Sequence, residues 1–329
     1  LCAHEHYEDC PWREQALYGM DSRNQMLFGY GAFNEYDYPR AAMLLMSKCV
    51  EEDGLLPLCP PARSSITIPS FSLYYIIAVC ENAERDYNAA FVSAVLPAVK
   101  KIMRVFRSAT NEKGALSTLG DVRYWNFHEW SDGLDGGEIW RKEAVKPKGD
   151  CILTALAVIA AEKLSVLLKK AGEKQAATEM SAFAETLLIG LKTFYDADKG
   201  VFASYSDGGN LFGYHEYTQA TALLASRGRF GKEVTENLVC TLKNPKDLVG
   251  ITLAGLPVKY EALLNYAGKS AKKYVLDDCM NLFGKMLLSG ATSFWETGYG
   301  AEDFDDAGSL CHGWSSVACY VLDTIFPQK

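Results

Sequence analysis

Residues 150–172 read DCILTALAVIAAEKLSVLLKKAG, and this stretch indicates the fold class of the chain. Its apolar side chains recur every three or four residues, which is the spacing of one face of an α-helix. Asp150 is placed to cap the start of this helix, and Gly172 is placed to end it. Glu162 and Lys163 interrupt the apolar run, so it is shorter than a membrane span requires. We therefore predict a core helix here and no membrane-spanning segment.

The same periodicity recurs along most of the chain. It predicts further helices at 22–34, 39–49, 71–83, 88–107, 174–194, 217–226, 271–288 and 310–325. Long alternating stretches are nearly absent, so no extensive sheet is expected. After three helices come a polar turn, a glycine (Gly54, Gly114 or Gly200) and a short apolar piece, in which the glycine supplies the positive φ that ends the helix. These glycines are too unevenly spaced for a stacked solenoid of fixed period.

The chain has 329 residues and shows neither a linker nor a change of composition along its length. We therefore expect residues 1–329 to form a single domain. A closed ring of helical hairpins buries an inner layer of helices and needs a chain of about this size. An open bundle or an α-solenoid is the alternative architecture.

Composition narrows the function classes. The net charge is −8, whereas nucleic-acid binders need a basic face, so no nucleic-acid partner is expected. Ten cysteines occur without a CxxC pair, which indicates mainly buried free thiols in a reducing compartment. Because their number is even, a few disulfides are still possible. With no signal peptide recognised, we expect a cytoplasmic location. Aromatic residues make up 12%, and together with abundant carboxylates they suit a site for neutral sugars.

Several sequence motifs of other enzyme classes are missing. There is no GxSxG, no Walker loop, no GxGxxG after a strand and no HExxH, which disfavours serine esterases, nucleotide enzymes, dehydrogenases and zinc proteases. Five histidines are spread along the chain, so we expect no metal and no cofactor. The chemistry that remains is chemistry performed by carboxylates.

Three acidic and aromatic clusters could perform it, at residues 9–21, 122–140 and 291–315. Each also has a structural interpretation. In the first, Asp21 could cap the next helix and Arg13 could pair with a neighbouring acid. The second could be a long loop packed by its own aromatic rings, although such loops are often functional. In the third, His312 could be an ordinary buried polar residue, or it could bind a hydroxyl group.

The three clusters together resemble one family. Residues 9–21, DCPWREQALYGMD, are similar to the D-C-P-x-R-E-R-x-G-W-x-G-D loop of the α-L-rhamnosidases of glycoside hydrolase family 78. Residues 292–296, TSFWE, resemble the family's T-T-x-W-E, and residues 309–312, SLCH, resemble its S-L-x-H. The order of the motifs also agrees, so the resemblance spans nearly the whole chain. It implies an (α/α)6 barrel, the six-hairpin glycosidase fold.

The resemblance also implies roles for individual residues. Glu14 would be the general acid and Glu296 the general base of an inverting glycoside hydrolysis. Trp130 is similar to an aromatic residue that walls the sugar site. The residues that the resemblance assigns to substrate binding are Asp9, Arg13, Asp21, Trp125, Glu129, Trp130 and His312.

The expected function is removal of terminal α-L-rhamnose from a rhamnose-containing glycoside or oligosaccharide, with no membrane or nucleic-acid partner. The family's R-x-G-W is here Gln15-Ala16-Leu17-Tyr18, which leaves the identity of the sugar open. Two alternatives are a six-hairpin hydrolase for another linkage, such as a glucuronide or glucoside, and a barrel that binds oligosaccharide without cleaving it. The flanking β-sandwich domains usual in the family are not visible in this chain.

Overall fold

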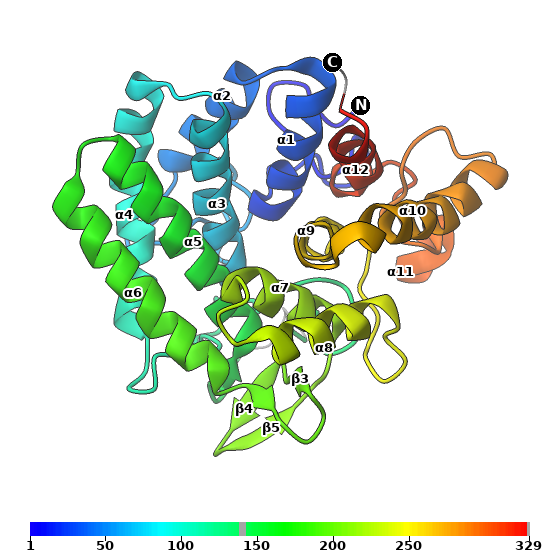
Figure 1. Ribbon diagram of the computed structural model, residues 1–329. Coiled ribbons are helices and arrows are strands. Elements are labelled where there is room, and N and C mark those ends of the chain that lie inside the picture. Colours follow the sequence, from blue (N-terminus) through cyan, green and yellow to red (C-terminus); the bar gives the residue numbers. More distant parts are fainter. Residues whose placement is uncertain (138–142, 328–329) are drawn as a thin grey trace.

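The computed structural model of the protein describes residues 1–137 and 143–327. Six helices form an inner ring: α1 (Gly19–Phe33), α3 (Pro69–Arg85), α5 (Cys151–Lys170), α7 (Glu216–Ser226), α9 (Leu256–Tyr266) and α12 (Val317–Ile325). Each packs against the next, and α12 packs against both α9 and α1. The ring is therefore closed, as Figure 1 shows.

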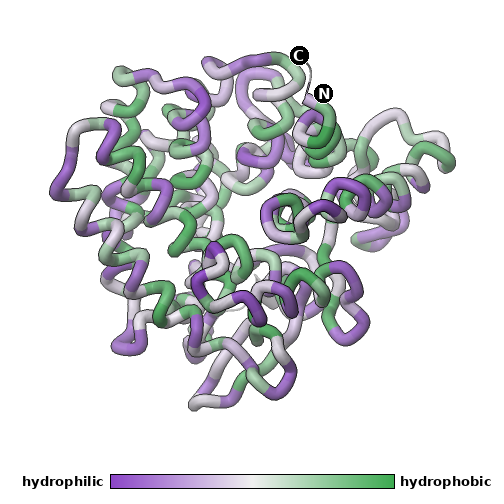
Figure 2. The backbone as a smooth tube through the Cα atoms, in the orientation of Figure 1, coloured by the Kyte–Doolittle hydropathy of each residue, from purple (hydrophilic) through white to green (hydrophobic). Residues whose placement is uncertain are grey.

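A second layer of helices surrounds this ring. It consists of α2 (Asp37–Ser47), α4 (Ala89–Ala109), α6 (Lys174–Lys192), α8 (Lys232–Lys243) and α10 (Ala271–Leu288). Each outer helix follows an inner helix in the chain and packs against the ring. In Figure 2 the outer helix α6 alternates between hydrophobic and hydrophilic residues, as expected for a helix with one covered face. This arrangement confirms the predicted (α/α)6 barrel and excludes the open bundle and the solenoid.

Short elements complete the described part of the chain. They are the four-residue α11 (Asp303–Asp306) and the 3-10 turns η1 (Gly268–Ser270), η2 (Gly300–Glu302) and η3 (Gly313–Ser316). Two strands, β4 (Tyr205–Asp207) and β5 (Asn210–Phe212), form an antiparallel hairpin, and β1 (Gly149–Asp150) pairs with β4. A second antiparallel pair joins β2 (Tyr195–Asp196) to β3 (Val201–Phe202). As predicted, no extensive sheet occurs among the described residues.

Helix α5 forms as its sequence predicts. The Asp150 side chain accepts a hydrogen bond from the Leu153 N–H at 2.9 Å, and Gly172 follows the helix with a φ of +87°. The helix is long and apolar enough to cross a membrane, but 72% of its most apolar stretch is buried inside the protein. It contacts α3, α6 and α7, so its apolar character reflects burial in the core.

The predicted turn glycines have the expected conformation. Gly54, Gly114 and Gly200 all have positive φ values, but they lie in the turns beyond the helices and do not end them, because α2, α4 and α6 end five to eight residues earlier. At Gly114 a Cβ atom would lie 2.3 Å from the Thr186 carbonyl oxygen, so only glycine fits against α6.

Among the described helices longer than four residues, α8 and α9 are not predicted by the periodicity analysis. The outer helix α8 carries Val234, Leu238 and Leu242 at four-residue intervals, so the signal for it exists in the sequence. The inner helix α9 has little polar surface to reveal it, because Asn265 is its one exposed residue and even Lys259 is buried, where it pairs with Glu216 at 3.0 Å. A helix that is enclosed over most of its surface shows only weakly the periodic pattern by which amphipathic helices are recognised.

The ring also determines where the loops meet. Because inner and outer helices alternate along an antiparallel path, all inner helices point the same way. The segments that precede α1, α3, α5 and α12 therefore converge at one end of the ring. These segments contain the three motif clusters, apart from residues 138–140 of the second cluster, which lie outside the described residues.

Candidate active site

A cavity of about 340 Å³ lies where these segments converge. Its lining combines acids, one imidazole and a large aromatic surface. The lining residues are Asp9, Glu14, Tyr18, Asp21, Leu58, Ile68, Phe71, Trp125, Phe127, Trp130, Glu296, His312 and Trp314. Such a cavity, with a few converging polar groups on an apolar wall, is typical of a small-molecule site.

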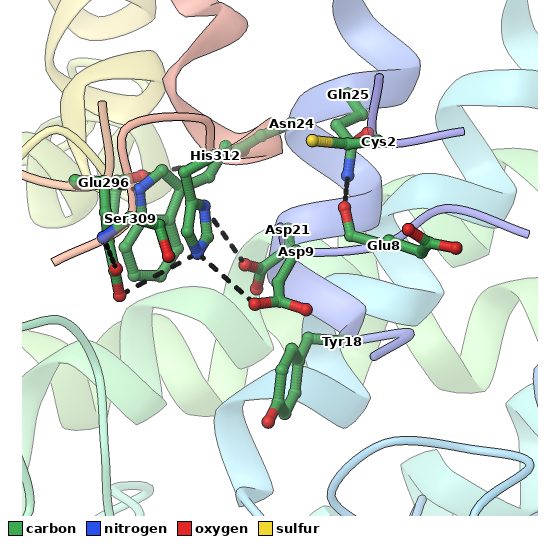
Figure 3. Close-up of polar contacts among 12 residues, drawn as sticks. Cys2, Glu8, Asp9, Tyr18, Asp21, Asn24, Gln25, Glu296, Ser309 and His312 are labelled. Carbon is green, nitrogen blue, oxygen red and sulfur yellow. Dashed lines mark hydrogen bonds and ion pairs between the residues drawn. The ribbon is translucent and has the colours of Figure 1, made fainter. Parts of the chain in front are cut away.

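His312 stands at the centre of three carboxyl groups (Figure 3). Its Nε2 lies 3.7 Å from Asp9 Oδ2 and 3.9 Å from Glu296 Oε1, and its Nδ1 lies 3.9 Å from Asp21 Oδ1. All four residues are buried. Asp9 Oδ2, Asp21 Oδ2 and His312 Nδ1 make no hydrogen bond within the described part of the chain. Buried polar atoms rarely stay unpaired, so these atoms are available to the hydroxyl groups of a ligand.

Burial changes the protonation of this cluster. It raises the pKa of Asp9 to about 6, although hydrogen bonds from Cys10 and Ala16 act in the opposite direction. It also raises the pKa of Asp21 well above its usual range, and the charge of Asp9 adds to that effect. For His312, burial and then the Arg13 charge lower the pKa well below its usual range. Burial therefore favours the protonated carboxyl group of Asp21, and it keeps the imidazole of His312 neutral near neutral pH.

Glu296 is held firmly in place. Its backbone N–H donates to the Ser309 carbonyl at 2.8 Å, and its carbonyl accepts from Trp314 Nε1 at 3.0 Å. Arg13 Nη2 donates to both carboxylate oxygens, at 2.7 and 2.8 Å, and the Ser309 N–H donates to Oε2 at 3.0 Å. Burial alone would lower the pKa of Arg13, but the hydrogen bonds and charge of Glu296 outweigh that effect and raise it.

Glu14 contacts the same guanidinium group, that of Arg13. Its side chain is 39% exposed. Arg13 Nε lies 3.5 Å from Glu14 Oε1, and the Tyr18 hydroxyl donates to Glu14 Oε2 at 2.7 Å. Arg13 thus contacts both acidic side chains, one from each end of the chain.

Aromatic rings also line the cavity. The Phe127 and Trp130 ring centroids are 4.9 Å apart, and those of Trp125 and Trp130 are 5.8 Å apart. Trp125 Nε1 donates to the Asp135 carbonyl at 2.7 Å, which fixes the ring. Aromatic faces of this kind can stack on the apolar faces of a pyranose.

Residues 1–324 match the family described as the bacterial α-L-rhamnosidase six-hairpin glycosidase domain. The chain belongs to this family. The predicted membership in glycoside hydrolase family 78 is thereby confirmed. A search among curated proteins found no match.

Solved structures of rhamnosidases share the fold of this family member. The family 78 rhamnosidase of Bacillus sp. GL1 is 26% identical with a TM-score of 0.86, and the match covers 98% of this chain and 33% of that chain. A Klebsiella oxytoca rhamnosidase with rhamnose bound is 19% identical with a TM-score of 0.79, covering 98% and 61% of the two chains. The Streptomyces avermitilis α-L-rhamnosidase complexed with L-rhamnose is 14% identical with a TM-score of 0.73, and the match covers 97% of this chain and 29% of that chain. This chain therefore spans about one third to three fifths of the length of these relatives.

Seven of the nine predicted site residues of this glycosidase domain line the cavity: Asp9, Glu14, Asp21, Trp125, Trp130, Glu296 and His312. Asp21 does not cap α1, because the helix begins two residues earlier, at Gly19. Arg13 is absent from the lining, and its guanidinium group is engaged by the Glu296 side chain and the Ala307 carbonyl.

Glu129 is also absent from the cavity lining, although it was predicted to bind substrate. It is fully buried, accepting hydrogen bonds from Ser131 Oγ at 2.8 Å and from Thr252 N and Oγ1 at 2.9 and 2.7 Å. Burial raises its pKa to about 7 despite these hydrogen bonds. In this structure Glu129 therefore anchors the loop that carries Trp130.

Six lining residues were not predicted to bind substrate: Tyr18, Leu58, Ile68, Phe71, Phe127 and Trp314. Tyr18, Phe127 and Trp314 lie inside the motif clusters, so their positions in the sequence indicated them. Leu58 and Ile68 lie in an ordinary loop and carried no such signal. Among the described residues, no group of three or more His, Cys, Asp or Glu could hold a metal ion.

Proposed function

We propose that this domain is an inverting exo-glycosidase that removes terminal α-L-rhamnose from a glycoside. The observation that carries the proposal is that Glu14 and Glu296, from opposite ends of the chain, line one cavity with an aromatic wall. The named ligand of the Klebsiella and Streptomyces relatives, rhamnose, supports the choice of sugar.

The proposed reaction uses the two carboxyl groups in different protonation states. Glu14 gives its proton to the glycosidic oxygen as the bond to the anomeric carbon breaks, and the leaving group departs as a neutral alcohol or phenol. Glu296 takes a proton from a water molecule, whose oxygen attacks the anomeric carbon from the opposite face. The product is a free sugar with inverted configuration.

The shared contact with Arg13 limits the distance between the two carboxyl groups. Glu14 Oε1 lies 3.5 Å from Nε of Arg13, and Glu296 Oε1 lies 2.7 Å from its Nη2. The distance between these two oxygens can therefore be no larger than the sum of the two contact distances and the separation of Nε and Nη2 within the guanidinium group. That upper limit is compatible with the window of about 6.5–9.5 Å for inverting enzymes, and the anomer of the first product distinguishes inversion from retention.

In this proposal the unpaired buried atoms recognise the sugar. Asp9 Oδ2, Asp21 Oδ2 and His312 Nδ1 exchange hydrogen bonds with ring hydroxyls, and Trp130 covers an apolar face of the sugar. Arg13 orients Glu296 and keeps a positive charge beside it.

The test is hydrolysis of an alkyl α-L-rhamnoside, whose leaving group needs protonation, by the wild-type chain and by Glu14→Gln and Glu296→Gln. We expect each variant to lose about 10²–10⁴-fold in kcat, the usual contribution of a general acid or base. Proton NMR of the first product should show β-L-rhamnose, the inverted anomer.

Other outcomes would contradict the proposal in distinct ways. Unchanged turnover in both variants would remove Glu14 and Glu296 from the mechanism, and an α-product would exclude inversion. Cleavage of a glucoside or glucuronide in preference to the rhamnoside would indicate another linkage. Calorimetric sugar binding without turnover on any aryl glycoside would indicate a non-catalytic barrel.

A further inference from the structure

The segment 9–16 is a closed loop with Glu14 near its end. The Asp9 N–H donates to the Ala16 carbonyl at 3.0 Å, and the Ala16 N–H donates to Asp9 Oδ1 at 2.8 Å. Gln15 adopts a φ of +53°, in the left-handed region. These contacts fix the backbone, but they leave the Glu14 side chain, at 39% exposure, to be held by its own contacts.

Tyr18 supplies the shorter of the two contacts described for this side chain. Its hydroxyl lies 2.7 Å from Glu14 Oε2, whereas Arg13 Nε is 3.5 Å from Oε1, beyond a good hydrogen bond. Tyr18 is itself anchored, because it precedes α1 and its carbonyl accepts from the Ser22 N–H at 3.0 Å. Its ring packs edge-on against Phe71, with centroids 6.2 Å apart.

We propose that Tyr18 is the positioning residue for the general acid, an inference that rests on the proposed function above. Its hydroxyl holds Oε2 of Glu14, so that the proton to be donated is carried by the other oxygen, Oε1. As that proton moves to the glycosidic oxygen, the electron pair stays on Glu14, and the Tyr18 hydroxyl stabilises the carboxylate that forms.

The state of the phenol suits this role. Burial, followed by the negative charge of Glu14, raises the pKa of Tyr18 above its usual value, so the hydroxyl stays a donor at any working pH. A half-exposed carboxyl group otherwise samples several rotamers, and restricting it to one geometry favours proton transfer.

The proposal predicts a dependence on the leaving group. Tyr18→Phe removes one oxygen and keeps the ring that packs on Phe71. A phenol that leaves easily needs little protonation, so kcat/KM should change by less than about three-fold for a 4-nitrophenyl α-L-rhamnoside. For an alkyl α-L-rhamnoside, which depends on the acid, kcat/KM should fall about 10- to 100-fold, the size expected for a hydrogen bond to a charged group.

Tyr214→Phe is the matched control. The Tyr214 hydroxyl donates to Asp196 Oδ2 at the same distance, 2.7 Å, and Tyr214 does not line the cavity. Removal of the Tyr214 hydroxyl should leave kcat/KM unchanged for both the 4-nitrophenyl and the alkyl α-L-rhamnoside.

A double variant tests whether Tyr18 acts through Glu14. In a Glu14→Gln background, Tyr18→Phe should have no further effect on the alkyl substrate, because there is no longer an acid to position. Equal losses on both substrates, or an additive loss in the double variant, would overturn the proposal in favour of direct sugar binding. If Glu14→Gln shows the leaving-group dependence and Tyr18→Phe does not, the proposal fails while the proposed function stands.

Discussion

The buried carboxyl group of Asp9 lies in an environment that does not suit a charge. Its pKa is raised to about 6 by burial, and Oδ2 is unpaired within the described part of the chain. The same residue lies 3.7 Å from His312, which burial keeps neutral. Site residues of this kind cost folding free energy in the absence of ligand, which is a frequent trade-off between function and stability.

The raised pKa predicts how Asp9 affects stability. Its folded-state pKa is above its unfolded value, so the folded protein binds more protons between about pH 4 and pH 6 and loses stability as the pH rises through that range. Asp9→Asn abolishes this titration. We expect the variant to be more stable relative to wild type at pH 7 than at pH 4. The difference in the free energy of unfolding, variant minus wild type, should be about 1–3 kcal/mol larger at pH 7. Urea denaturation at both pH values measures it, and an equal difference at the two would contradict it.

At the scale of elements, the start of α5 connects the barrel to the site. Asp150 Oδ1 caps the helix through the Leu153 N–H, and its Oδ2 lies 2.9 Å from Nε2 of the buried His128. His128 belongs to the same loop as Trp125 and Trp130. One carboxylate therefore joins the core helix to the loop that carries the aromatic wall.

Asp150→Ala should destabilise the protein through both contacts. We expect a loss of about 2–4 kcal/mol in the free energy of unfolding, the sum of a helix cap and a buried hydrogen bond. Asp150→Asn retains an oxygen for the cap and should lose less than half as much. Guanidinium denaturation followed by circular dichroism compares the two variants, and equal losses would show that the cap contributes nothing.

At the scale of the whole molecule, the ring closes where α12 meets α1 and α9. Val321 of α12 is completely buried, while the next residue, Leu322, is 44% exposed. The two positions share a helix and differ in whether they face the ring.

We therefore expect Val321→Asp to place an unpaired charge in the interior and cost more than about 4 kcal/mol. Leu322→Asp should change the free energy of unfolding by less than about 1 kcal/mol. Thermal unfolding by circular dichroism and tryptophan fluorescence measures both variants. Similar unfolding temperatures for the two would mean that closure of the ring does not support the fold.

Local features of this protein could be predicted from the sequence because they depend on residues a few positions apart. The periodicity of 150–172, the cap at Asp150 and the turn at Gly114 are such features, and the structure contains all three. The largely enclosed helix α9 is not predicted, because the periodic signal is weak when most of a helix is buried.

Tertiary structure decided which predicted site residues meet. Glu14 and Glu296 lie 282 positions apart, and only the closed ring brings them onto one guanidinium group. The resemblance assigns Glu129 to substrate binding, yet its carboxylate accepts a hydrogen bond from Thr252, a partner that no local pattern reveals. The sequence by itself determined the helices and the set of acids available for chemistry, because both follow from short-range spacing and residue type. Which acids share a cavity depended on contacts across the ring, because long-range packing determines burial and pairing.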